Sequence, residues 1–144
     1  MTIIIKSGYQ PKSRRIKNNW QKIEREFFDI IRSFNLRKKN KYICYISLYG
    51  PFGQFKYPDA VNLRVSNTKD IKKANQTIAH ELIHLLIYNK AEKLKLNYKQ
   101  TEGIVDLFFI KTKLRNIFPD YKLQSIVIHD EKLFESLFAS IARK

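Results

Sequence analysis

The feature that most constrains this chain is a long segment, residues 69–95, in which apolar residues recur at helical spacing. The apolar positions that mark its buried side are Ile71, Ala74, Ile78, Leu82 and Leu85. Within the segment, residues 78–88 read IAHELIHLLIY, so two histidines and a glutamate stand among apolar neighbours. We therefore predict a helix in the core that carries polar side chains with a specific purpose.

His80 and His84 are four residues apart, which places both rings on one helical face about one turn apart. Two imidazoles at that separation can bind one tetrahedral Zn²⁺ ion. Glu81 stands beside that face, where a carboxylate can take a proton from a water at the open position of the metal. The alternative is an ordinary helix with two partly buried histidines. We favour the metal, because burying unpaired histidines and a glutamate costs free energy.

A second helix is predicted over residues 101–117, with Thr101 as its start and Pro119 beyond its end. Glu102 and Asp106 are four residues apart on this helix and are surrounded by apolar residues. Two acids that face inward need a charged partner, and a catalytic zinc needs a third protein ligand. We predict that Glu102 is this ligand and that Asp106 accepts a hydrogen bond from a ligand histidine. The alternative for Asp106 is exposure to solvent or pairing with a lysine.

The remaining patterns complete an α+β chain. Strands are expected over residues 2–6 as an edge strand or arm, over residues 42–49, and over residues 60–65. Further helices are expected over residues 18–36 and, capped by Asp130, through residue 142. Residues 7–15 have the composition of a basic loop, and residues 123–128 suit either a strand or a helix.

Residues 60–65 alternate between polar and apolar positions, which is typical of a sheet edge with one face exposed to water. The 144 residues suit one domain, residues 1–144. We therefore predict a single α+β domain with a small mixed or antiparallel sheet of about three strands.

The net charge of +15 is interpreted as a lysine-rich compositional bias, with an acidic partner (nucleic acid, an anionic membrane or an acidic peptide) as the less favoured alternative. The basic residues 12–25 are interpreted as a solvated helix face, with a nucleic-acid surface as the rival interpretation. The single cysteine, Cys44, excludes an internal disulfide, fits a reducing compartment and is predicted to be a small buried hydrophobe. No run approaches the ~20 apolar residues of a membrane span, and no secretory signal is apparent, so a cytoplasmic protein is expected.

An HExxH motif followed after 18 residues by ExxxD resembles the gluzincin metallopeptidases, a family that includes thermolysin. In size the chain is most similar to the minigluzincins. The resemblance implies a zincin-like fold with an active-site helix, a glutamate helix and flanking N- and C-terminal helices. It also implies one Zn²⁺ ion bound by His80, His84 and Glu102, with Glu81 as base and acid and Asp106 orienting a histidine.

The same resemblance implies that the strand of residues 60–65, with Asn62, holds the substrate backbone by strand addition. Larger gluzincins stabilise the tetrahedral intermediate with a Tyr or His, for which Tyr121 and His129 are the candidates here. Rival interpretations make His129 a surface residue beside the cap at Asp130, or a ligand in a latent state. The family also includes latent, zymogen-like proteins whose C-terminal part obstructs the cleft.

The function expected from these motifs is that of a zinc endopeptidase acting on peptide or protein substrates. The first alternative is a catalytically weak regulatory or binding module of zincin fold with a structural zinc, associated with nucleic acid. The second is a phage- or plasmid-type protein that resembles the repressor-cleaving zincins. The sequence leaves open a homodimer and the identity of the substrate.

Overall fold

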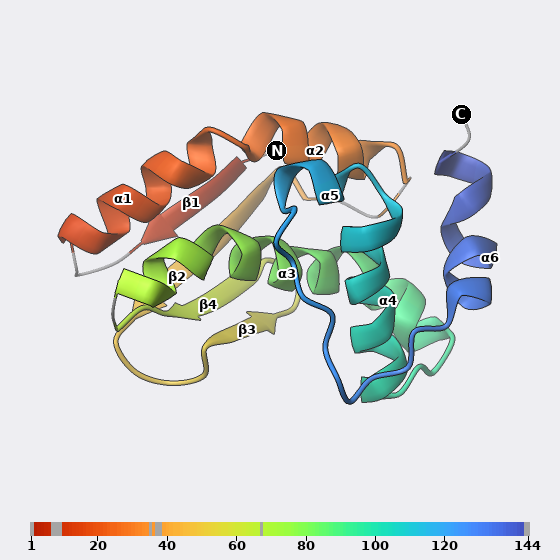
Figure 1. The fold of residues 1–144 in the computed structure, drawn as a ribbon. Helices are drawn as coiled ribbons and strands as arrows, with labels where there is room; N and C mark the ends of the chain where they lie inside the picture. Colours follow the sequence, from red (N-terminus) through yellow and green to blue (C-terminus); the bar gives the residue numbers. More distant parts are fainter. Residues whose placement is uncertain (1, 7–9, 35, 37–38, 67, 143–144) are drawn as a thin grey trace. The chain divides into compact units, whose positions relative to one another are not determined.

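The computed structural model describes residues 2–6, 10–34, 36, 39–66 and 68–142. These residues contain six helices and a four-stranded mixed sheet (Figure 1). This content agrees with the predicted α+β class. The elements in chain order are β1 (Thr2–Lys6), α1 (Gln10–Gln21), α2 (Glu24–Arg32), β2 (Lys41–Ser47), β3 (Gly53–Lys56), β4 (Ala60–Arg64), α3 (Thr68–Lys93), α4 (Tyr98–Lys111), α5 (Leu114–Ile117) and α6 (Glu131–Ala142). None of the described helices is long and apolar enough to cross a membrane.

The chain divides into two compact units. The first unit consists of residues 1–25 and 38–86, and the second of residues 26–37 and 87–144. Helices α2 and α3 each begin in the first unit and end in the second. Organisation as a single folding domain stays a prediction.

The sheet of the first unit has the strand order β1-β2-β4-β3. Strands β1, β2 and β4 are parallel, whereas β3 pairs with β4 in the antiparallel direction. The predicted edge position of β1 is confirmed. The predicted edge position of residues 60–65 is wrong, because β4 lies between β2 and β3. The alternation of polar and apolar residues in β4 matches a difference in burial between the two faces of the sheet. Val61 and Leu63 on one face are buried, whereas Asn62 and Arg64 on the other are half-buried.

Strand β2 supplies the centre of this unit's core. Its residues alternate in burial, and Tyr42, Cys44 and Ile46 are the buried ones. Cys44 is completely buried and pairs in register with Ile5 on one side and Val61 on the other. The prediction of a small buried hydrophobe is confirmed. Burial also raises the pKa of the Cys44 thiol to about 12, since the thiolate would lose its hydration.

The helix predicted over residues 18–36 is two helices, and the first begins earlier than expected. The prediction of a loop over residues 7–15 is wrong from Gln10 onward, while residues 7–9 lie outside the described residues. Pro11 stands in the first turn of α1, where its missing N–H removes no helical hydrogen bond. After the break, Glu24 accepts hydrogen bonds from the indole Nε1 of Trp20 at 3.2 Å and from the backbone N–H of Ile3 at 2.7 Å. The carboxylate of Glu24, the first residue of α2, therefore connects β1 to α1.

An aromatic cluster forms the core of the second unit. Phe108 of α4 lies 5.3 Å from Phe34, 5.1 Å from Phe134 and 4.9 Å from Phe138, measured between ring centroids. The last two rings belong to α6, so α6 packs on α4 through this cluster. Asp130 accepts a hydrogen bond from the backbone N–H of Leu133 at 2.9 Å, which confirms it as the cap of α6.

Helix α4 starts before the predicted Thr101. Asn97 is its N-cap and forms a capping box with Gln100, in which each side chain accepts from the other residue's backbone N–H. The helix ends at Lys111, and the predicted continuation to residue 117 is the separate short helix α5.

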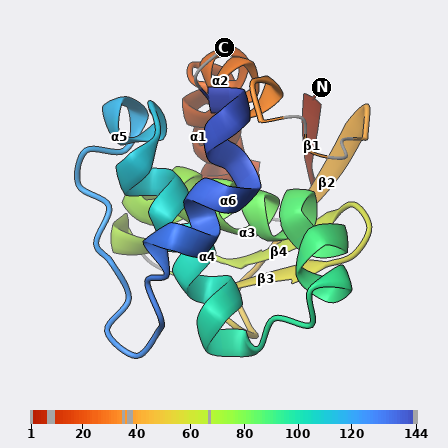
Figure 2. The same ribbon diagram turned by 90° about the vertical axis from the view of Figure 1, so that its right-hand side faces the viewer.

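Residues 118–130, here called the return segment, are neither the strand nor the helix that residues 123–128 suggested. Figures 1 and 2 show this segment running back along α4 toward its N-terminal end before it enters α6. The backbone N–H of Ile128 donates to the carbonyl of Lys99 at 3.1 Å. A Cβ atom at Gly103 would lie 1.7 Å from the carbonyl oxygen of Ile128, so only glycine allows this approach.

Cys44 should react slowly with a disulfide reagent in the folded protein. A pKa of about 12 leaves about one thiolate in ten thousand thiols at pH 8, and complete burial shields the sulfur further. The measurement is the rate of thiol modification at pH 8 in buffer and in denaturing urea. Rapid modification in urea with slow modification in buffer is expected. Equal rates in the two solutions would contradict the burial.

Candidate metal centre

Two histidines meet on one face of α3, as their spacing predicted. The ring centroids of His80 and His84 are 5.0 Å apart, and the planes are inclined at 61°. One ring nitrogen of each histidine lies within 4.8 Å of the other, a separation that two ligands of one ion can have. His84 is 3% exposed and His80 is half-buried, and Glu81 beside them is 8% exposed. The face is therefore largely withdrawn from water.

Strand β3 covers this face of α3 and was not predicted. The ring of Phe55 stacks on His84, with centroids 4.7 Å apart and planes within 9° of each other. At Gly53, an added Cβ would lie 2.5 Å from the Cγ2 of Thr77 and 3.1 Å from the Oε1 of Glu81. The backbone of β3 thus passes directly over Glu81, and Phe55 fixes the plane of one histidine.

The position of β3 also corrects the role that the resemblance gave to Asn62. Asn62 pairs with Tyr45 of β2 on one side and with Gln54 of β3 on the other, so β4 has strand neighbours along both edges. Strand addition needs an edge, and the strand at this end of the sheet is β3. Any contact between the sheet and an extended peptide beside Glu81 therefore belongs to β3.

Glu102 lies on α4 and is 8% exposed. Among the described residues, His80, His84 and Glu102 make up a group that could hold a metal ion. Two imidazole nitrogens and one carboxylate oxygen suit zinc, and also other first-row metals that accept nitrogen and oxygen ligands. The predicted ligand set is therefore chemically consistent with one bound ion.

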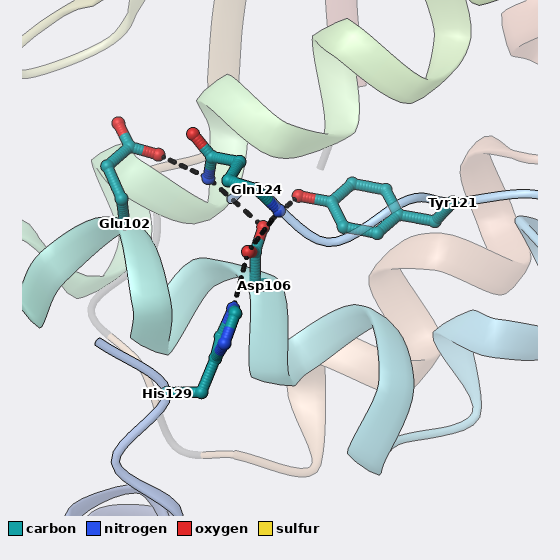
Figure 3. A network of polar contacts seen from close by, with 5 residues as sticks. All are labelled: Glu102, Asp106, Tyr121, Gln124 and His129. Carbon is teal, nitrogen blue, oxygen red and sulfur yellow. Dashed lines mark hydrogen bonds and ion pairs between the residues drawn. The ribbon is translucent and has the colours of Figure 1, made fainter. Parts of the chain in front are cut away.

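Asp106 is the centre of a polar network on α4 (Figure 3). The carboxylate is completely buried and accepts hydrogen bonds from Tyr121 Oη at 2.5 Å and from the backbone N–H of Gln124 at 2.8 Å. It also accepts from the side-chain Nε2 of Gln124 at 3.0 Å and contacts Nε2 of His129 at 2.8 Å. The alternative of solvent exposure or a lysine partner is not what the structure shows. The histidine bonded here is His129, and a bond to a ligand histidine stays a prediction.

The two candidates for stabilising a tetrahedral intermediate, Tyr121 and His129, both bind Asp106. The ring of Tyr121 also stacks on Phe109, with centroids 3.9 Å apart and planes within 2°. The side chain of His129 is 29% exposed, so it is not the plain surface residue of the rival interpretation. In this structure the two side chains attach the return segment to α4, and their role toward an intermediate stays a prediction.

Sequence reasoning missed three residues of this region: Gly53, Phe55 and Gln124. No periodic pattern marks any of them, because each acts through a contact with a residue distant in sequence. Gly103 did carry a weak signal, since a glycine inside a helical pattern lowers helix stability relative to alanine, and a packing reason can offset that loss. That signal indicates a packing contact without identifying the segment that makes it.

Gly53→Ala should lower the free energy of unfolding by about 1–3 kcal/mol, because the new Cβ is too close to the Cγ2 of Thr77. Thr77→Ser removes that methyl group and keeps the hydroxyl that donates to the carbonyl of Lys73. The double variant should therefore recover part of the loss, measured by urea unfolding. Gln54→Ala, at the exposed neighbouring position, is the control. Purely additive losses in the double variant would contradict the contact.

No family model, no curated protein and no solved structure matches this chain. The resemblance to the gluzincins thus rests on two short motifs.

Proposed function

We propose that this protein is a zinc-dependent metallopeptidase of the gluzincin type. The observation that carries the proposal is the group formed by His80, His84 and Glu102, which could hold a metal ion. Two histidines and a glutamate match the ligand set of catalytic zinc sites, which keep a further position open for water. Glu81 adjoins the first histidine in sequence and supports a hydrolytic role over a purely structural one.

The residues present fit such an ion by their chemistry and by their setting. Both imidazoles lie on one face of α3 with their ring nitrogens within 4.8 Å, and Phe55 holds the ring of His84 by stacking. When bound, zinc would supply a water of lowered pKa and would polarise the scissile carbonyl. The low exposure of His84 and Glu102 strengthens electrostatic interactions at the site.

Glu81 is the group of this chain that would move the proton. Glu81 is 8% exposed, and its Oε1 lies under the backbone of β3 at Gly53, where glycine adds no side chain of its own. In the proposed reaction this carboxylate takes a proton from the attacking water and gives it to the leaving amine. Strand β3, at the end of the sheet, would orient an extended substrate beside Glu81 by backbone hydrogen bonds.

A second function is supported by the basic face of α1. Arg14, Arg15 and Lys17 are exposed, and α1 contains no acidic residue. Within the part of the chain that the structure describes, no ion pair involves these three side chains. Exposed cations along one helix suit the phosphates of nucleic acid, and this would make the protein a zinc-holding binding module.

Zinc content and peptide cleavage together test the first proposal. After reconstitution with excess zinc and removal of unbound metal, elemental analysis should find about one zinc per chain. Glu81→Gln should retain zinc, because Glu81 is not a ligand, and should lower cleavage of a fluorogenic peptide library by about 10²–10⁴-fold. Glu92→Gln, at an exposed position of the same helix, is the matched control and should cleave like the wild type.

His84→Ala completes this test, because loss of an imidazole ligand should abolish stoichiometric zinc. A wild-type protein that takes up no zinc would overturn the proposal. Cleavage that persists unchanged in Glu81→Gln would overturn the role of that residue as base.

The salt dependence of nucleic-acid binding tests the second function. Replacing Arg14, Arg15 and Lys17 by Gln removes three charges, so the slope of log K against log[salt] should fall by roughly 2–3. Fluorescence anisotropy with a labelled duplex at several salt concentrations provides the measurement.

The matched control removes three exposed basic residues elsewhere in the chain: Lys113, Arg115 and Lys122. An equal change of slope in both variants would show that net charge alone is responsible. Absence of binding at low salt would contradict the second function.

A further inference from the structure

One side chain of the return segment bridges the two acids of α4. Nε2 of Gln124 donates to Oε2 of Glu102 at 2.9 Å and to Oδ1 of Asp106 at 3.0 Å (Figure 3). A primary amide has two N–H donors, so it can serve both carboxylates at once. The backbone N–H of Gln124 also donates to Oδ2 of Asp106 at 2.8 Å.

An amide suits this position better than other side chains of similar size. Glu102 and Asp106 are 8% and 0% exposed, and two buried carboxylates one helical turn apart repel each other. A neutral double donor lowers that repulsion without adding a charge. A glutamate at position 124 has the same shape, but it lacks both donors and adds a third negative charge.

The backbone around Gln124 is held by contacts that do not involve Glu102. Asp106 binds the backbone N–H of Gln124 and the side chains of Tyr121 and His129. Farther along, Ile128 rests on α4 where Gly103 has no side chain. The side chain of Gln124 therefore reaches Glu102 from a backbone that other contacts hold in place, and it donates to Oε2 of that carboxylate.

We propose that Gln124 is the positioning residue for Glu102, and that it presents this carboxylate to a metal ion in a fixed orientation. The inference rests on the metal centre proposed above and adds a residue that neither motif contains. Partners of metal ligands typically change metal affinity by about 10–100-fold when they are removed. Gln124 should therefore affect zinc binding although it does not contact the ion.

Zinc affinity measured by competition with a chromophoric chelator tests the proposal. Gln124→Ala should bind zinc about 10–100-fold more weakly than the wild type. Tyr121→Phe removes a donor to Asp106 but keeps the ring stacked on Phe109, and Ser125→Ala changes an exposed neighbour. Both of these variants should bind zinc much like the wild type. Gln124→Glu serves as a second variant of preserved shape, and its affinity should also fall.

Cobalt(II) gives a readout that a merely structural role of Gln124 would not change. The visible bands of bound Co²⁺ depend on the geometry of its ligands, so they should shift in Gln124→Ala if the plane of Glu102 changes. The same bands should stay in place in Tyr121→Phe and Ser125→Ala.

The outcomes separate this inference from the proposed metal centre. A wild-type protein without zinc would refute the centre itself. A wild-type protein that binds zinc, together with unchanged affinity and cobalt bands in both Gln124 variants, would overturn only the role of Gln124. An equal loss in Tyr121→Phe would also overturn it, because the return segment would then act as a whole.

Discussion

The complete burial of Asp106 is the constraint on which the second unit depends. A carboxylate without access to water needs hydrogen-bond donors, and the partners that the structure gives Asp106 all lie outside α4. Tyr121, Gln124 and His129 supply them, so the return segment must follow α4 closely. That course brings the backbone of the segment so near to α4 that Gly103 cannot carry a side chain. Asp106 thereby holds three residues of the return segment, and the hydrogen bond from Ile128 to Lys99 holds the segment closer to its end.

The sequence predicted those helices, strands and caps whose signals lie within a short stretch of the chain. The long helix α3, the edge strand β1 and the cap of α6 at Asp130 were all predictable, because each repeats or is completed within a few residues. Strand β3 was not, since its four residues GQFK contain one apolar side chain, Phe55, and its contact is with a distant histidine. The first turns of α1 were missed because Pro11 and a basic composition suggested a loop.

The same distinction applies to the candidate site. Both histidines lie on one helix four residues apart, so their common face followed from helical geometry alone. Glu102 could be proposed because an inward-facing acid needs a partner. Gln124 is 22 residues from Glu102 and 18 from Asp106, and no local pattern of the chain distinguishes it from a surface glutamine. Its position depends on the path of the return segment, which only the folded structure provides.

Two of the four glycines stand beside an acid of the candidate site, one in space and one in sequence. Gly53 lies against Glu81, and Gly103 adjoins Glu102 in sequence and lies under Ile128. In a chain with so few glycines, these placements are informative, because any side chain there would move either the acid or the strand or segment that covers it. Helical periodicity places His80 and His84 on one face of α3, and Glu102 and Asp106 on one face of α4. The close backbone approaches determine how those faces are covered, and therefore how each carboxylate is presented.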